Sequence, residues 1–307
     1  MSRPFRFGLL VEGDRLNRRA LLDLVARAEA EGYGILLGTD HLGRLASAPL
    51  LQAAAEATHL RIGTLVLNND FRSPVILAQE LATLDMLTEG RLEIGLGAGW
   101  ARTEYDASAM PFDAPGRRVA RLQATVAMLK QALGEGRIER DADDAYPKML
   151  LEGMPRSVQR PHPPFLIGGG GRRVLSYAAR EAQIVGLDPR AFREGGHDLS
   201  DVTEAAIDEK IGWIREAAAE RLADLEINLI VFGVDPQFGR RSGPSPALSH
   251  PITEEEMAGS PHYLVGDTDE MTEQLIARRE RWGINYLAIK PTHMDLLAPV
   301  IARLAGT

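Results

Sequence analysis

Short apolar runs alternate with stretches of helical periodicity along most of the chain. The first run, residues 5–11, has the pattern of a buried strand, and apolar residues then recur at helical spacing up to Gly32. Seven further runs follow in the same way, at residues 35–37, 62–67, 92–96, 164–167, 184–187, 227–234 and 286–289. Since a helical pattern follows each run, the sequence predicts eight strands alternating with eight helices.

This alternation predicts an α/β fold, and eight units without a break in composition favour a (β/α)8 TIM barrel. Such barrels need roughly 250 residues, and two excursions account for the extra length of this chain. Residues 135–163 follow the fourth helix and carry charge and four prolines, whereas residues 235–262 follow the seventh strand and are rich in Pro, Gly and Ser. We expect a single domain over residues 1–307. A doubly wound sheet is the alternative, but no dinucleotide fingerprint follows the first strand.

Four consecutive glycines, Gly168, Gly169, Gly170 and Gly171, lie between the fifth strand and its helix. Residues without Cβ let the backbone approach a ligand closely, and the helix that follows presents its N-terminal N–H groups. The run therefore predicts a phosphate-binding loop, and Arg172 at the start of the helix could pair with the phosphate or with a ligand carboxylate. The alternatives are a tight turn without a ligand and a solvent-exposed helix end.

Residues that directly follow the predicted strands are mostly polar. They include Glu12, Asp40, His41, Asn68, Asn69, Asp70, Trp100, Glu104, Asp188, Asp235 and Lys290. In a barrel these positions meet at the C-terminal ends of the strands, where the active site lies. Asp40 beside His41 is a candidate catalytic pair, because an imidazole held in register can exchange protons near neutral pH. A structural histidine is the alternative, and most of the other six histidines, which lie in predicted helices or excursions, are assigned that role.

Gly97, Ala98 and Gly99 follow the fourth strand and predict space for a flat ring beside it, with the next helix starting only near Gly116. A metal site is poorly supported, because the chain contains no HxH or HExxH spacing. The chain also lacks a nucleophile elbow, so acyl-transfer chemistry is not indicated.

Composition limits the partners and the compartment. The 35 Lys and Arg against 43 Asp and Glu give a net charge of −8, which offers no electrostatic reason to expect nucleic acid or an anionic membrane as a partner. Cysteine is absent, and the N-terminal apolar run is too short for a signal peptide or a membrane span. We therefore expect a cytoplasmic protein that acts on a small molecule.

Several strings in combination resemble the bacterial luciferase-like superfamily over nearly the whole chain. They are GTDHL at 38–42, RIGTLVL at 61–67, GRLEIGLGAGW at 90–100 and the glycine run. Within that superfamily the chain is most similar to the branch that uses the deazaflavin coenzyme F420, as the strings NNDFRSP at 68–74 and SPH at 260–262 indicate.

The resemblance implies a barrel whose third strand has a non-proline cis peptide behind the flavin ring, at Leu65–Val66 or the next bond. It implies cofactor contacts at Leu65, Val66 and Asn68, the phosphate on the glycine run, and His41 beside the redox-active ring. Family members are often homodimers. Relatives tend to have an aromatic β-hairpin after the fourth helix, whereas residues 140–146 here read RDADDAY. The substrate of this protein is therefore not inferred from that of its relatives.

The sequence thus predicts an oxidoreductase that exchanges a hydride between F420 and a small organic substrate, with His41 as proton donor or acceptor. Two alternatives remain open at this point. One is a reduced-FMN-dependent monooxygenase, which would consume oxygen. The other is a non-catalytic barrel that binds a flavin without turnover.

Overall fold

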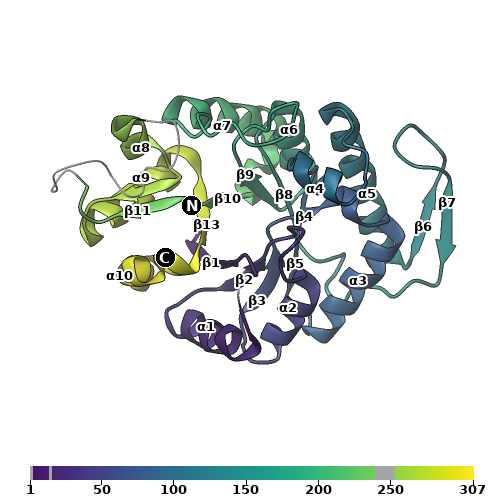
Figure 1. Ribbon diagram of the computed structural model, residues 1–307, viewed down its shortest axis with the longest axis horizontal. Coiled ribbons are helices and arrows are strands. Elements are labelled where there is room, and N and C mark those ends of the chain that lie inside the picture. The colour runs from purple at the N-terminus through teal and green to yellow at the C-terminus, as the bar shows by residue number, and fades with distance from the viewer. Residues whose placement is uncertain (1–2, 14–15, 239–252) are drawn as a thin grey trace.

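Eight parallel strands form a closed barrel in the computed structural model, which describes residues 3–13, 16–238 and 253–307 (Figure 1). They are β1 (Arg6–Val11), β2 (Ile35–Gly38), β3 (Arg61–Thr64), β5 (Leu92–Gly97), β8 (Phe165–Gly169), β9 (Ile184–Leu187), β10 (Glu226–Ile230) and β13 (Ile284–Ile289). Their order around the barrel is β3-β2-β1-β13-β10-β9-β8-β5, and pairing of β3 with β5 closes the ring. The predicted (β/α)8 barrel is confirmed.

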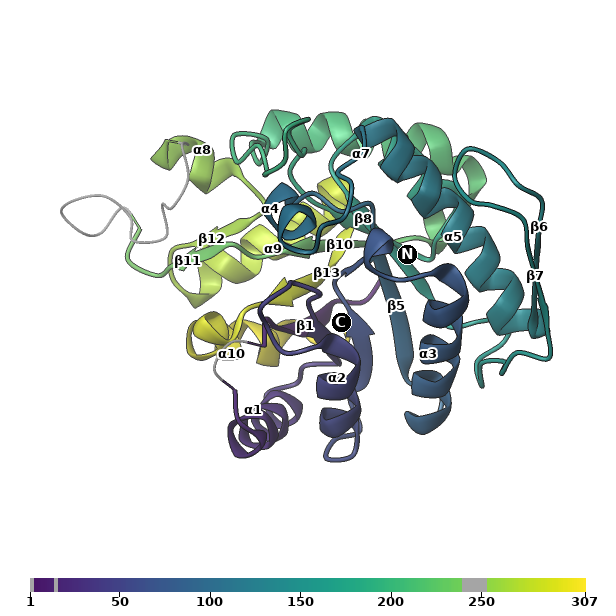
Figure 2. The same ribbon diagram turned by 45° about the vertical axis from the view of Figure 1, so that its right-hand side comes forward.

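A helix follows each strand and packs on the outside of the barrel (Figures 1 and 2). These helices are α1 (Arg18–Ala30), α2 (Ser47–Ala55), α3 (Pro74–Leu87), α5 (Pro115–Glu135), α6 (Arg172–Glu181), α7 (Glu204–Ala218), α9 (Thr268–Trp282) and α10 (Met294–Leu304). Helix α9 shows how the sequence sets their bounds. It begins at a capping box between Asp267 and Glu270 and ends at Gly283, whose φ is 76°. None of the helices in the described part of the chain combines the length and apolarity that crossing a membrane requires.

The barrel interior is filled by a small apolar core that includes Leu10, Leu37, Leu166 and Tyr286. Beneath it, Glu93 is only 4% exposed and accepts hydrogen bonds from Arg6 and Arg61 at 2.5 and 2.6 Å. The larger core lies between the sheet and the outer helices. Because charged side chains fill the N-terminal end of the barrel, the C-terminal end is left for a ligand.

Two predicted strands are interrupted. The run at 62–67 divides into β3 and β4 (Leu67–Asn68), with a non-proline cis peptide at Leu65–Val66, as the resemblance implied. The run at 227–234 is wrong as one strand, because the chain leaves the barrel after Ile230. It continues as β11 (Gly233–Asp235), which pairs with β12 (Tyr263–Val265) in a separate small sheet. An apolar run does not record which strand it will pair with, so periodicity could not locate either break.

The excursion at 135–163 contains an antiparallel hairpin of β6 (Arg137–Arg140) and β7 (Met149–Glu152), which projects beside α5 at the right of Figure 1. Its sequence had shown little periodicity. The excursion at 235–262 ends in α8 (Glu254–Gly259), whereas residues 239–252 lie outside the described residues. The interval before the fourth outer helix also contains a short helix, α4 (Arg102–Ala107), so the expectation that no helix starts before Gly116 is wrong.

His262 connects the small sheet to the barrel. Its Nδ1 donates to the Ile230 carbonyl at 2.9 Å, its ring stacks on Phe232 at 4.4 Å, and the side chain is fully buried. Burial lowers the pKa of His262 to about 4 from its usual 6.5. The imidazole therefore stays neutral in the native state at a pH where the unfolded chain takes up a proton.

We expect the resulting stability to be present above pH 6.5 and to be lost as the pH falls toward 4, by about 3 kcal/mol in total. His262→Gln keeps a donor for Ile230 but does not titrate there, so the stability difference between wild type and variant should shrink over this range. Urea unfolding at pH 7, 5.5 and 4.5 measures it, with the exposed His59→Gln as the matched control. Parallel stability curves for wild type and His262→Gln would contradict this account.

Candidate functional site

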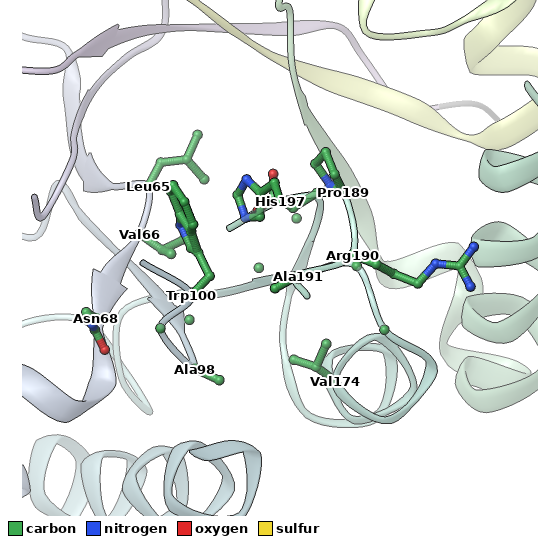
Figure 3. Close-up of a pocket in the computed structure, with 18 of the residues that line it drawn as sticks. Leu65, Val66, Asn68, Ala98, Trp100, Val174, Pro189, Arg190, Ala191 and His197 are labelled. Carbon is green, nitrogen blue, oxygen red and sulfur yellow. The ribbon is translucent and has the colours of Figure 1, made fainter. Parts of the chain in front are cut away.

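A pocket of about 630 Å³ opens at the C-terminal ends of the strands. It is lined by the residues that the sequence proposed as catalytic or cofactor-binding, whereas Asn69, Asp70 and Asp235, also expected at the strand ends, do not line it. The lining residues are Asp40, His41, Leu65, Val66, Asn68, Gly97, Ala98, Gly99, Gly168, Gly169, Gly170, Gly171 and Arg172. Figure 3 shows the part of the pocket between Leu65 and Val66 on one side and Arg190 on the other. The barrel topology brings these residues together because every strand contributes its C-terminal end to one opening.

His41 is held by a carboxylate from the segment after β5, the next strand but one from β2 in the barrel. Its Nδ1 lies 2.8 Å from Oε1 of Glu104, and the same oxygen accepts the backbone N–H of Leu42 at 3.2 Å. Because an ionised carboxylate only accepts, Nδ1 carries the hydrogen, and Nε2 is the atom left to exchange a proton with a ligand. Glu104 lies on α4, the short helix that the sequence analysis did not find.

Asp40 does not hold His41, which corrects the expected pair. Its two oxygens accept a bidentate bond from Arg72 at 2.7 and 3.0 Å, and Oδ2 also accepts the N–H of Asn68 at 3.0 Å. The two neighbours in sequence therefore have different partners, Arg72 for Asp40 and Glu104 for His41. Asp40 fixes the exit of β4 instead.

Trp100 lies between two histidines. Its indole is edge-on to His41 at 6.0 Å and stacked on His197 at 4.0 Å, and Figure 3 shows the Trp100 and His197 rings facing each other. The Nε2 of His197 lies 3.1 Å from Oδ2 of Asp188. His197, which the sequence did not single out, lines the pocket as a second imidazole with its own carboxylate.

The loop that carries His197, residues 188–201, is anchored by a buried lysine. Nζ of Lys210 donates to the carbonyls of Asp188 and Asp201 at 3.0 and 2.9 Å, and to Oδ2 of Asp201 at 2.7 Å. Both side chains of this ion pair are at most 1% exposed. Thr203, rather than Asp201, is the N-cap of α7. All three hydrogens of the ammonium are used, so both ends of the loop are fixed.

The floor of the pocket is Val66, packed over two glycines. A Cβ at Gly97 would lie 2.7 Å from a methyl of Val66, and one at Gly168 would lie 3.3 Å from the other methyl. Gly99 has φ of +75°, and a Cβ there would lie 2.1 Å from the hydroxyl of Tyr105. The glycines after β5 therefore accommodate protein atoms, a different reason from the expected space for a flat ring.

The glycine run contains two kinds of position: Gly169 and Gly170 pack against protein atoms, whereas Gly171 leaves open space. A Cβ at Gly169 would lie 2.5 Å from Val174, and one at Gly170 would lie 2.5 Å from the backbone of residues 188–190. Gly171, the N-cap of α6, has nothing within 4 Å of such an atom, and no side chain caps this helix. The N–H groups of the first turn of α6 therefore face a space that an anion can enter.

Arg118 is a further cation at this end of the pocket and was missed from the sequence. It is 2% exposed, its Nη1 donates to the Asp113 carbonyl, and its Nε has no partner among the described residues. Burial lowers its pKa below the usual value. The guanidinium of Arg172 instead lies on Glu216 of α7 at 2.9 Å, and that of Arg173 reaches the Gly116 carbonyl at 3.0 Å.

The sequence model of the luciferase-like monooxygenase family matches residues 4–230. The chain belongs to this family. It is 30% identical over 190 residues to an F420-dependent glucose-6-phosphate dehydrogenase of Segniliparus rotundus, over 59% of this chain and 56% of that protein. The chain thus matches about half the length of its curated relatives.

Solved structures share the fold. The F420-dependent tetrahydromethanopterin reductase of Methanopyrus kandleri superposes with a TM-score of 0.77 at 18% identity, over 98% of this chain and 99% of the other. The monooxygenase RslO1 of Streptomyces bottropensis gives 0.71 at 20% identity, over 97% of each chain. The same barrel therefore occurs in a protein named as an F420-dependent reductase and in one named as a monooxygenase.

Part of this family member's pocket escaped sequence analysis for one reason. His197, Arg118 and the partner role of Glu104 depend on contacts between segments far apart in the chain. The Gly195-Gly196 pair is the one local signal for the His197 loop. Gly195 has φ of +101°, and a Cβ there would lie 2.6 Å from Arg102.

Single alanine substitutions separate the two kinds of glycine in the run. Gly170→Ala forces a Cβ against the backbone of residues 188–190, so we expect the free energy of unfolding to fall by about 1 to 3 kcal/mol. Gly171→Ala enters open space at φ −95°, and its free energy of unfolding should stay within about 0.5 kcal/mol of wild type. Chemical denaturation measures both. Equal losses in the two variants would show that the space at Gly171 is not open.

Proposed function

We propose that this protein is an F420-dependent oxidoreductase that exchanges a hydride with a small organic substrate. The observation that carries the proposal is the pairing of His41 with Glu104 in a pocket that also contains the uncapped N-terminus of α6. One part of the pocket offers a group for proton transfer, and the other offers N–H donors for a phosphate. The names of the curated relatives support F420 as the cofactor.

The residues present fit a phosphate-bearing flavin or deazaflavin. The orphaned Nε of Arg118 and the open space at Gly171 are what a cofactor phosphate would use, and the Leu65–Val66 peptide with Val66 offers an apolar floor for a ring. When bound, the cofactor supplies a carbon that accepts or donates a hydride. The protein's part is to orient the substrate and to take or give its proton at Nε2 of His41, with Glu104 as the positioning residue.

A reduced-FMN-dependent monooxygenase is the second candidate, supported by the family description and by the likeness to RslO1. Oxygen consumption separates the two, because deazaflavins react poorly with oxygen. A barrel that binds a flavin without turnover would show neither activity.

Three further properties belong to this proposal. Homodimerisation is expected from the family resemblance, and exposed Ile76, Met86 and Leu150 on α3 and β7 offer apolar surface for it. Cytoplasmic residence rests on the absence of cysteine. The negative net charge supports a small-molecule substrate without nucleic acid or membrane partners.

Cofactor binding can be tested without a substrate. Purified protein titrated with F420 and FMN, each oxidised and reduced, should show tighter fluorescence quenching with F420. Gly171→Val adds a branched side chain at the cradle, where its Cβ would meet no protein atom within 4 Å, and loss of one charge-assisted bond predicts at least a tenfold weaker affinity. Gly171→Ala is the matched control. Unchanged affinity in a folded Gly171→Val would place the phosphate elsewhere.

Substitutions at His41 test its role in proton transfer. His41→Ala should bind F420 normally and turn over about 10²- to 10⁴-fold more slowly, measured as reoxidation of bound reduced cofactor by a panel of enones, quinones and imines. His41→Asn keeps a hydrogen bond but does not titrate. Wild-type turnover in this variant would mean that His41 only orients the ligand and does not transfer a proton. Glu104→Gln retains the contact without the charge and should fall between wild type and His41→Ala. Wild-type rates in His41→Ala would refute the assignment.

A further inference from the structure

Charged side chains divide the pocket into two unlike halves. Arg118, Arg172 and Arg173 line the part formed by the N-termini of α5 and α6, beside the glycine run. The carboxylates of Glu12, Asp40 and Glu104 line the part that also contains His41. An anion is therefore favoured at the glycine run and disfavoured near His41.

Lys290 is the cation that lines the His41 part of the pocket among the described residues, and it is already neutralised. It follows β13, next to Glu12 at the end of β1, and its Nζ lies 3.3 Å from Oε1 of Glu12. Arg190, at the exit of β9, is directed away from the pocket in Figure 3 and pairs with Asp201 at 2.8 Å. A phosphate placed beside His41 would thus meet a paired lysine and the carboxylate that pairs with it.

The Glu12–Lys290 pair contributes little to stability. Both side chains are about a third exposed, and ion pairs in such surroundings are typically worth less than about 1 kcal/mol. Its effect on a charged ligand is larger, because a phosphate dianion would have to displace Glu12 from Lys290 and remain close to it. The neighbouring walls, Leu10, Ile230 and Phe232, are apolar or aromatic and offer no further charge.

We propose that Glu12 sets substrate specificity by pairing with Lys290, so that the pocket excludes phosphorylated substrates and admits uncharged alcohols or carbonyl compounds. This rests on the proposed function only in placing the substrate beside His41. The curated relatives, in contrast, are named for a phosphorylated sugar. The same fold would thus accept a different substrate class through one ion pair.

The test uses calorimetric titration of the purified protein, with and without F420, against glucose 6-phosphate. Wild type should bind it weakly or not at all, whereas Glu12→Gln, which frees Lys290, should bind it at least tenfold more tightly. The double variant Glu12→Gln/Lys290→Gln should lose that gain, which separates Lys290 from Arg44, a second partner of Glu12 at 3.3 Å. Glu139→Gln, on the exposed hairpin, is the control for loss of one negative charge.

A second arm compares turnover by the F420-loaded wild type of 2-butanol and cyclohexanol with that of glucose 6-phosphate. Oxidation of the neutral alcohols alone supports the proposal. Tight binding or preferred oxidation of glucose 6-phosphate by wild type overturns it, as does unchanged affinity in a folded Glu12→Gln. Absence of F420 binding would refute the proposed function separately, because the calorimetric arm does not depend on the cofactor.

Discussion

The closure of the barrel combines backbone pairing of β3 with β5 and one side chain that extends this pairing. At the seam between β3 and β5 the hydroxyl of Thr64 donates to the Gly95 carbonyl and accepts the Gly95 N–H, each at 2.9 Å. The two backbones approach so closely that a Cβ at Gly95 would lie 1.8 Å from the Thr64 carbonyl oxygen. This contact carries the chain across the break between β3 and β4. It therefore brings Val66 over Gly97 and Gly168, and the pocket floor follows from it.

The parts of the fold that sequence could predict are those recorded locally. Each strand is a short apolar run, and each outer helix repeats apolar residues at helical spacing, so the eightfold alternation was visible along the chain. The breaks within strands and the pairing partners depend on residues far away in the sequence. Strand β10 ends at Ile230, and beyond it Phe232 donates its N–H to the His262 carbonyl at 2.7 Å. No feature of residues 227–234 contains that information.

The site divides in the same way. The positions of Asp40, His41 and the glycines could be predicted because they follow strands, whose C-terminal ends a parallel barrel gathers on one side. The contacts that require these residue types could not be predicted. Asp40 binds Arg72, and Gly97, Gly169 and Gly170 are small because protein atoms lie against them. A residue type in a motif thus reports a spatial constraint without saying whether a ligand or the protein imposes it.

The anchoring of the His197 loop makes that loop an exchangeable module. Lys210 fixes both of its ends from the interior of the fold, while its middle contacts the pocket through His197 and Trp100. Removing either partner of a buried ion pair is costly, so the anchor constrains variation at Asp201 and Lys210 together. Residues 191–194, between the anchored ends, are exposed. Loops of other lengths and chemistries could be grafted there, which would reshape the pocket wall while the barrel beneath stays the same.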